Sequence, residues 1–245
     1  MVAGRLVAIL DAFRLGGGDS LGVSELARRT GLAKATVHRL VGHLVETGLL
    51  ERDGQTVRLG SKLFELGQRV PRQRDLRDAA RPAMADLRDA TGHTVHLAVR
   101  EGAEVLYVDI LPGPDAPATP ATIGGRWPVH ATGVGKAMLA FASAADREEL
   151  LAGPLPRVSA RTVSAPGLLA KELATIAAAG IAFDREESKT GLVCAASPIF
   201  DPDGVVAAVS VSGWSTRTDL DRVAAAVRTA ALTISRGLGA ATPRR

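Results

Sequence analysis

The chain has 245 residues, a formal net charge of +4 and one cysteine, so an intrachain disulfide bond is excluded and a reducing compartment is expected. Residues 1–75 contain 12 Lys and Arg against 8 Asp and Glu, whereas residues 76–245 contain 18 of each, which places the positive excess in the N-terminal part. No apolar run approaches the ~18 residues of a membrane span, and no signal-peptide core is visible, so we expect a soluble, cytoplasmic protein with no membrane partner.

A first amphipathic helix is predicted from four apolar residues at helical spacing: Leu6, Ile9, Leu10 and Phe13. The flexible glycine-rich loop GGGDS, residues 16–20, is expected to end it. Residues 23–48, VSELARRTGLAKATVHRLVGHLVETG, then predict two helices joined by a tight turn. We expect Ser24 to cap the first of these helices and Gly31 to end it in the left-handed backbone conformation.

The second of these helices is suited to a DNA major groove. One face is apolar and is expected to be buried: Val37, Leu40, Val41 and Leu44. The residues off that face near the helix start are mostly basic or small. We predict that the following residues of the two helices contact DNA: Ser24, Lys34, Ala35, Thr36, His38 and Arg39. This pattern is typical of a helix-turn-helix, and the alternative is an ordinary helical hairpin with a solvated basic face.

A β-hairpin is predicted directly after this motif. Residues 49–52 and 55–59 have the pattern of two short strands, and Asp53-Gly54 is a two-residue turn signal. A hairpin in this position is a wing, and we expect Arg52 and Arg58 to anchor it on DNA. Together these elements predict a winged helix-turn-helix DNA-binding domain over residues 1–61.

A linker is predicted over residues 62–74, with an effector-binding domain over residues 75–245. The linker includes a short helix and most of the basic sequence VPRQRDLR. A helix over residues 75–91 follows, and Pro82 is expected either to kink it or to begin a second helix. Helices at such a position often carry a dimer contact, although a solvated face is an equal alternative.

The remainder of the chain predicts an α+β domain with a mostly antiparallel sheet. The runs VHLAVR and EVLYVDIL are β-like and are joined at Glu101-Gly102. Helical patterns follow, and three further strands are expected within residues 181–213. The sequence Asp201-Pro202-Asp203-Gly204 predicts the turn between the last two strands, before a final helix over residues 219–238.

Several motifs that suggest chemistry fail closer inspection. ATGVGKA, residues 131–137, lacks the first glycine and the final hydroxyl residue of a phosphate-binding loop, although its glycines can seat a carboxylate at a helix start. His93 and His96 do not have zinc-site spacing and are interpreted as ordinary histidines. Strand periodicity places Ser210 and Ser212 on one face of the sheet, either packed beneath a helix or lining a polar pocket.

Taken together, these residues resemble the IclR family of bacterial transcriptional regulators over nearly the whole chain. In the N-terminal part, VSELARRTGLAKATVHRLVGHLVETGLLERD is followed by VRLGSKLFELG. In the second part, four segments carry the resemblance in order: HLAVREGAEVLYVDI, RWPVHATGVGKAMLA, GIAFDREESKTGLVCAASPIFDPDG and VVAAVSVSG.

The resemblance implies an N-terminal winged helix-turn-helix joined by a linker helix to a GAF-like α+β effector-binding domain. It implies a homodimer or a dimer of dimers, a palindromic double-stranded DNA operator, and control by a small organic-acid or aromatic effector. It also implies a pocket built from six residues: Gly133, Val134, Asp184, Cys194, Ser210 and Ser212. The Pro/Ala-rich loop 112–120 and Trp127 are particular to this chain, and if they border the pocket, no relative's effector can be transferred.

We therefore predict a ligand-responsive, sequence-specific DNA-binding regulator, a repressor or an activator, with no catalytic activity, cofactor or metal. One rival is a GAF-like enzyme with a regulatory DNA-binding head, and another is an architectural DNA-binding protein. The sequence contains no recognisable nucleophile–base pair and no metal-ligand set, which weighs against the enzyme.

Overall fold

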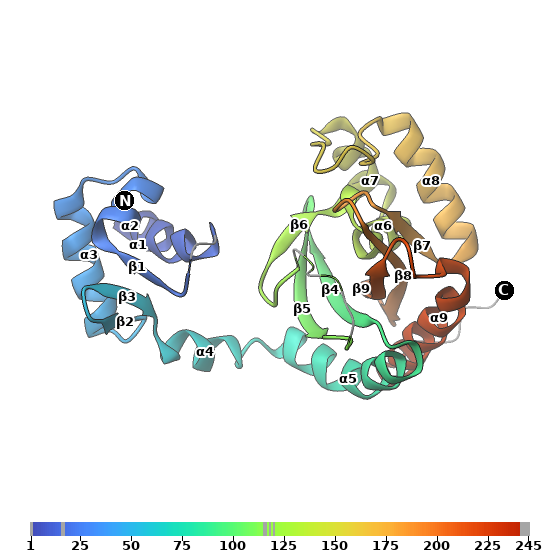
Figure 1. The fold of residues 1–245 in the computed structure, drawn as a ribbon, viewed down its shortest axis with the longest axis horizontal. Helices are drawn as coiled ribbons and strands as arrows, with labels where there is room; N and C mark the ends of the chain where they lie inside the picture. Colours follow the sequence, from blue (N-terminus) through green and yellow to red (C-terminus); the bar gives the residue numbers. More distant parts are fainter. Residues whose placement is uncertain (1, 16–17, 115–116, 118, 120, 241–245) are drawn as a thin grey trace. The chain divides into compact units, whose positions relative to one another are not determined.

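The computed structural model describes residues 2–15, 18–114, 117, 119 and 121–240. The chain divides into two compact units, residues 1–74 and residues 75–245 (Figure 1). The predicted loops at residues 16–20 and 112–120 lie partly outside the described residues. The predicted linker, residues 62–74, falls within the first unit, and its separate status stays a prediction.

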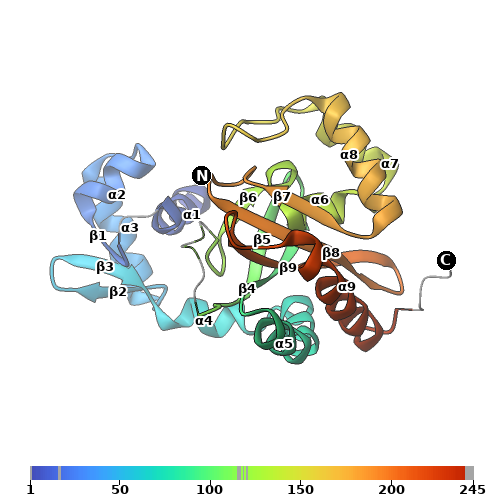
Figure 2. The same cartoon turned by 45° about the vertical axis from the view of Figure 1, so that its right-hand side comes forward.

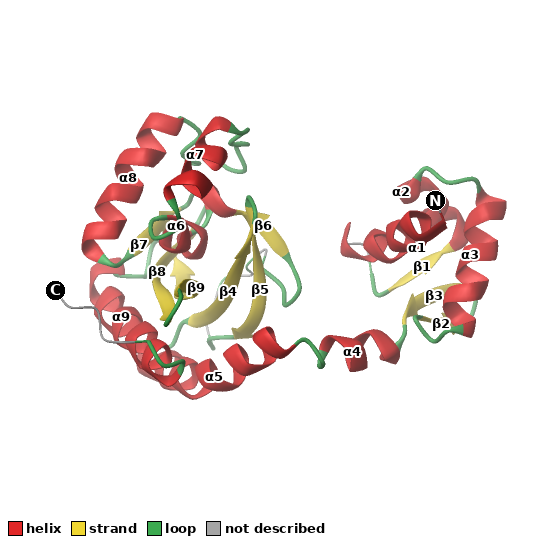
Figure 3. Cartoon of the chain, turned by 180° about the vertical axis from the view of Figure 1, so that it is seen from behind, coloured by secondary structure: helices red, strands yellow, loops and turns green. Residues whose placement is uncertain are grey.

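Helices and a three-stranded antiparallel sheet form the first unit (Figure 3). The helical elements are α1 (Val2–Asp11), the 3-10 turn η1 (Ala12–Leu15), α2 (Val23–Thr30), α3 (Lys34–Glu46) and α4 (Ser61–Gly67). The strands β1 (Ser20–Gly22), β2 (Leu50–Asp53) and β3 (Thr56–Leu59) pair in the order β1-β3-β2. Their apolar faces meet in one core, which includes Ile9, Leu26, Val37, Leu40 and Leu50. The fold of this unit is therefore that of a winged helix.

The hairpin differs from the sequence prediction by one residue. Asp53 pairs with Thr56, so the turn consists of Gly54 and Gln55 rather than Asp53 and Gly54. Gly54 has a φ of +59°, a conformation that side chains other than glycine rarely adopt. The sequence carries no signal for β1, because three residues are too few for an alternating pattern and β1 exists through its pairing with β3.

A six-stranded sheet organises the second unit, in the order β6-β5-β4-β9-β8-β7. Its strands are β4 (Thr94–Glu101), β5 (Glu104–Leu111), β6 (Arg126–Pro128), β7 (Ala182–Arg185), β8 (Leu192–Asp201) and β9 (Gly204–Trp214). Every neighbouring pair is antiparallel, which confirms the predicted sheet type. The β4–β5 turn again lies one residue later than predicted, because Glu101 pairs with Glu104.

Helices cover both faces of this sheet (Figure 2). On one face, α5 (Pro71–Thr91) and α9 (Leu220–Gly237) form a core with Val95, Val209 and Val211 of the sheet. On the other face, α6 (Gly133–Leu139), α7 (Ala144–Ala152) and α8 (Pro166–Ala179) pack against Ala98, Ala196 and Ala208. Because strand residues alternate between faces, His96, Ser210 and Ser212 point to the α6 side.

Helix α5 runs through Pro82 without a break in assignment, so the alternative that Pro82 begins a second helix is wrong. The helix also starts at Pro71, within the basic segment predicted as a linker. The predicted apolar face of this helix is buried: Leu76, Ala80, Met84 and Leu87. Burial of that face stabilises the helix more than the missing proline N–H destabilises it.

Candidate functional site

The α2–turn–α3 segment has the predicted helix-turn-helix organisation. Gly31 ends α2 with a φ of 68°, and the predicted apolar stripe of α3 is buried against the core: Val37, Leu40, Val41 and Leu44. Packing this stripe directs the opposite face of α3 outward. That face therefore presents side chains that the core does not need.

The outward face of α3 carries cationic and polar side chains. Lys34, Ala35, His38 and Arg39 are exposed and Thr36 is half-buried. Within the described part of the chain, the side chains of Lys34, His38 and Arg39 form no hydrogen bond or ion pair. No side chain caps the first turn of α3, so its initial N–H groups are also available to an external acceptor.

Ser24 does not cap α2, so this prediction is wrong. The N-cap is Gly22, no side chain bonds to the helix start, and Ser24 lies exposed inside the first turn. Helix α2 instead starts directly from β1, whose pairing with β3 fixes the entry of the chain. Glu25, also in that first turn, forms ion pairs with Arg28 and Arg29, which lower its pKa to about 2.

The two arginines predicted to anchor the wing lie on opposite faces of the hairpin. Arg52 pairs in register with the buried Val57, whereas Arg58 lies beside Glu51. Arg52 and His38 line one open groove between α3 and the hairpin. Arg58 is held by Glu51 at 3.1 Å, and only Arg52 is therefore free to extend the cationic surface of α3 among the described residues.

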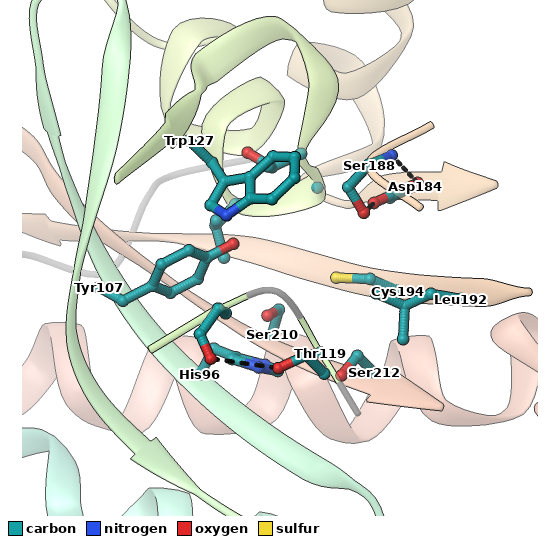
Figure 4. Close-up of a pocket in the computed structure, with 14 residues that line it drawn as sticks. His96, Tyr107, Thr119, Trp127, Asp184, Ser188, Leu192, Cys194, Ser210 and Ser212 are labelled. Carbon is teal, nitrogen blue, oxygen red and sulfur yellow. Dashed lines mark hydrogen bonds between the residues drawn. The ribbon is translucent and has the colours of Figure 1, made fainter. Parts of the chain in front are cut away.

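A small cavity lies on the α6 side of the sheet in the second unit (Figure 4). All six predicted effector residues line it: Gly133, Val134, Asp184, Cys194, Ser210 and Ser212. The other described residues of its wall are His96, Tyr107, Thr119, Ala121, Trp127, Thr132, Ser188 and Leu192. Trp127 and Thr119 of the Pro/Ala-rich loop therefore border the pocket, so the effector of a relative is not transferred to this chain.

The floor of the cavity is set by the close approach of α6 to β8. A Cβ atom at Gly133 would lie 3.0 Å from Cys194 Sγ, and one at Gly135 would lie 2.0 Å from the Val129 carbonyl oxygen. Thr132 caps α6 by accepting a hydrogen bond from the N–H of Gly135 at 3.1 Å. Gly135 is therefore required by packing, and a side chain at Gly133 would press on Cys194, whether or not a ligand binds there.

A tight turn holds Asp184 at the cavity edge. Its carboxylate accepts hydrogen bonds from the N–H groups of Glu187 and Ser188 at 2.6 Å and 3.3 Å, and from Ser188 Oγ at 2.5 Å. Within this turn Glu186 has a φ of 67°, which is uncommon for a residue other than glycine. Burial raises the pKa of Asp184, although the hydrogen bond from Ser188 opposes that rise.

Lys136 is fully buried beside this turn. Its ammonium group lies 2.6 Å from Glu187 Oε1 and 2.6 Å from Glu172 Oε1, and therefore links α6 to α8 and to the turn. Burial raises the pKa of Glu187, while the charge of Lys136 lowers it. A buried ammonium group requires such partners, so Lys136 holds the elements around the cavity together.

Two polar atoms in the cavity wall lack a hydrogen-bond partner among the described residues: His96 Nε2 and Ser212 Oγ. Burial lowers the pKa of His96 to about 4, so the imidazole is neutral at neutral pH. Burial also raises the pKa of Cys194 to about 12, which keeps its thiol protonated. The free volume is only about 20 Å³, which is room for roughly one water molecule.

Neither a metal-ligand cluster nor a membrane-spanning helix is found among the described residues. No group of three or more His, Cys, Asp and Glu side chains there is arranged to hold a metal ion. Similarly, none of the helices in this part of the chain combines the length and apolar character that a membrane span requires.

Comparison with known proteins decides the family. The model of the IclR helix-turn-helix domain matches residues 2–54, and the model of the bacterial transcriptional regulator IclR C-terminal domain matches residues 68–236. The chain belongs to the IclR family. It is 32% identical over 242 residues to the HTH-type transcriptional regulator XynR of Escherichia coli (strain K12), with 96% of each chain covered.

Solved structures of IclR proteins have the same fold. The crystal structure of an IclR homolog from Microbacterium hydrocarbonoxydans, complexed with 4-hydroxybenzoate, is 33% identical and has a TM-score of 0.91. The alignment covers 98% of this chain and 100% of that chain. These comparisons confirm the predicted fold class, an N-terminal helix-turn-helix unit followed by an α+β unit, with which a GAF-like description is consistent.

Membership in the IclR family also establishes the general function. The chain is a ligand-responsive, DNA-binding transcriptional regulator, and the family consists of regulators rather than enzymes. The rival prediction of a GAF-like enzyme is therefore not supported. Which residues contact DNA or effector stays a prediction.

Sequence reasoning missed part of the pocket wall. The spacing of His93 and His96 predicts ordinary histidines, and no motif points to Tyr107, Thr132 or Ser188, yet all except His93 line the cavity. The period-two pattern of β4 could have placed His96 on one sheet face. Only the pairing of His96 with Ser210 across β4 and β9 brings it beside the predicted serines.

Proposed function

We propose that α3 enters the major groove of double-stranded DNA and that Lys34, Thr36, His38 and Arg39 contact bases and phosphates there. The observation that carries this proposal is the set of exposed, unpartnered cations at the uncapped start of α3, among the described residues. Polyanionic DNA supplies the countercharge that the protein itself does not. Arg52 would extend the same surface along the groove that it shares with His38.

We expect the other residues predicted to contact DNA to contribute less to the affinity. Ser24 and Ala35 are exposed and can approach the phosphate backbone, but neither contributes charge. Arg58 must first loosen its 3.1 Å ion pair with Glu51 before it can anchor the wing on a phosphate. We therefore rank Arg39, Lys34 and Arg52 above Arg58 as determinants of affinity.

We further propose that the protein binds a palindromic operator as a homodimer or as a dimer of dimers. Helix α4 supports this, because none of its residues is buried and its large apolar side chains face solvent. Phe64 is 69% exposed and Leu66 is 54% exposed, and Leu59 and Val70 nearby are also exposed. A second copy of the chain would cover this surface, and two-fold symmetry would match an inverted DNA repeat.

We propose that the cavity in the second unit binds a small effector, and that the effector is aromatic. Tyr107 and Trp127 provide flat apolar surfaces, and Ser210 and Ser212 provide hydroxyl groups. The 4-hydroxybenzoate-bound relative shows that an IclR protein can hold an aromatic ligand, although that particular effector is not carried over to this chain. The alternative is an organic acid without a ring.

The size of the cavity suggests how the effector acts. A space of about 20 Å³ cannot hold an aromatic ring, so the effector must bind a conformation in which the wall has opened. A ligand that binds only the open form shifts the population toward it. The same shift would change how the DNA-binding units meet an operator, with a coupling of typically ~1–3 kcal/mol.

Fluorescence anisotropy with full-length protein tests these proposals together. The DNA should be a duplex from upstream of the protein's own gene, scanned for an inverted repeat by footprinting, because many regulators bind there. We expect salt-sensitive, sequence-specific binding whose affinity changes about fivefold or more when an aromatic compound binds. Specific binding that no bound compound alters would instead favour the architectural rival, and absence of specific binding would reject the recognition helix.

A further inference from the structure

An open groove of about 900 Å³ lies on the second unit, apart from the cavity proposed for the effector. Three segments form it: the C-terminal end of α8, the turn between β8 and β9, and the second half of α9 (Figure 1). Among the described residues, none that lines this groove also lines the effector cavity. The groove therefore needs an occupant of its own.

Most of the groove wall is apolar. Leu232 of α9 is 41% exposed, and the three alanines 177–179 at the end of α8 are exposed as well. Phe141 and Phe200 also line the groove and meet edge to face, with 5.2 Å between their ring centroids. A hollowed apolar surface inside a charged rim is typical of an interaction site.

The two edges of the groove carry opposite charges. Arg228 and Arg236 line the α9 edge, whereas Asp201 and Asp203 line the edge formed by the β8–β9 turn. No ion pair joins these two edges within the described part of the chain. The groove therefore keeps positive and negative side chains apart on one surface.

Only one residue on each edge lacks a partner. Arg228 donates a hydrogen bond to the Ala179 carbonyl oxygen at 3.3 Å. Asp201 accepts hydrogen bonds from two N–H groups of its own turn, at 2.8 Å and 3.1 Å. The side chains of Arg236 and Asp203 are exposed and form no hydrogen bond or ion pair among the described residues. These two opposite charges are therefore available to an external partner.

A second copy of the chain fits this arrangement. A partner of one charge sign would be attracted to one edge and repelled by the other. A two-fold axis brings the same surface together from both copies. The basic edge of each copy can then face the acidic edge of the other, and the two apolar walls cover each other.

We propose that this groove is a two-fold interface between two copies of the chain, in which Arg236 of one copy pairs with Asp203 of the other. Two different two-fold interfaces close into a tetramer, whereas one gives only a dimer. The α4 surface would supply the first interface and the groove the second, which selects the dimer of dimers. The tetramer thus rests on the proposed α4 dimer, but the groove interface does not.

Charge reversal tests the proposed pair by sedimentation equilibrium of the full-length protein at one salt concentration. We expect wild type to form tetramers at micromolar concentration. Arg236→Glu and Asp203→Lys should each raise the dissociation constant for the split into dimers by about tenfold or more. The double variant reverses the pair instead of removing it, so its dissociation constant should return to within about threefold of wild type.

Two further variants separate the groove from the rest of α9. Leu232→Glu places a charge in the apolar wall and should abolish the tetramer. Arg222→Glu is the matched control for charge, because Arg222 is exposed on α9 but does not line the groove. It should leave the dissociation constant unchanged, and thermal unfolding near that of wild type shows that each variant is folded.

Phe64→Glu on α4 distinguishes this inference from the proposed α4 dimer. Wild type that stays a dimer both with and without Leu232→Glu would overturn the groove interface and leave the α4 dimer standing. A tetramer that ignores both charge reversals, or that the double variant does not restore, would overturn the pairing of Arg236 with Asp203. Dissociation by Leu232→Glu but not by Phe64→Glu would reject the α4 surface and support the groove.

Discussion

The two units use positive charge in opposite ways. In the first unit, Lys34 and Arg39 are exposed on α3 and have no partner among the described residues. In the second unit, Lys136 is fully buried and bonds to two glutamates. An exposed cation is solvated and remains available to a polyanion, whereas a buried cation must be neutralised within the protein.

From this difference we expect exposed cations to contribute to binding and buried cations to contribute to the stability of the fold. Removal of an exposed cation should change what the protein binds without changing its stability much. Removal of a buried cation should change stability first, because its partners are left uncompensated. We expect four effects of decreasing size, at Lys136, His96, Arg39 and Ser24.

Lys136→Met should give the largest effect. It leaves Glu172 and Glu187 without their cation, and we expect the free energy of unfolding of the second unit to fall by ~3–5 kcal/mol. Both tryptophans, Trp127 and Trp214, belong to this unit, so urea denaturation followed by tryptophan fluorescence reports on it. Lys171, which is exposed on α8, provides the matched control Lys171→Met. Comparable losses in the two variants would remove the distinction between buried and exposed lysines.

Lowering the pH should destabilise the folded protein through the buried His96. Burial lowers its folded-state pKa to about 4 from 6.5, so the unfolded chain binds this proton first as the pH falls. The stability that neutral His96 contributes is therefore present above pH ~6.5 and lost toward pH ~4, with a loss of about 2 kcal/mol between pH 7 and pH 5.

His96→Gln provides the comparison for this pH effect. The raised pKa values of Asp184 and Glu187 give contributions of opposite sign, since their protonated forms are favoured in the folded state. These contributions are present in wild type and variant alike and cancel in the difference. Identical stability losses from pH 7 to pH 5 in the two proteins would contradict a neutral, desolvated His96.

Arg39→Ala tests whether an exposed cation of α3 contributes to DNA binding. We expect operator affinity to fall about 10- to 100-fold, while the folded structure and the effector response persist. Arg217→Ala removes the same charge from an exposed site in the second unit and should change affinity much less. Anisotropy titrations at one fixed salt concentration measure both, and an unaltered affinity in Arg39→Ala would contradict the recognition surface of α3.

Ser24→Ala should have the smallest effect on stability. Since Ser24 caps no helix, we expect a change within about 0.5 kcal/mol. Ser143→Ala is the informative contrast, because Ser143 accepts a hydrogen bond from the Asp146 N–H at 3.1 Å and its loss should cost ~1 kcal/mol. Calorimetry of both variants measures these changes in stability. A larger loss in Ser24→Ala than in Ser143→Ala would show that Ser24 does stabilise the fold.

Much of the fold followed from local patterns. Gly31 ends α2 in the left-handed conformation, and the apolar face of α3 is buried, as the sequence predicted. The errors concern elements that depend on partners. Gly22 rather than Ser24 precedes α2 because β1 pairs with β3, and three-residue strands such as β1 and β6 have too little sequence to show a period.

For the candidate sites, the sequence alone determined the exposed basic face of α3 and the shared face of Ser210 and Ser212, because helical and strand periodicity are local properties of the backbone. Tertiary structure alone decided that Arg52 and Arg58 point apart, that His96 joins the serines, and that Lys136 bonds to partners 36 and 51 residues away. Such contacts depend on which strands pair and which helix covers which face. The packing of distant segments, rather than any local preference, therefore set the charge and the volume of the cavity.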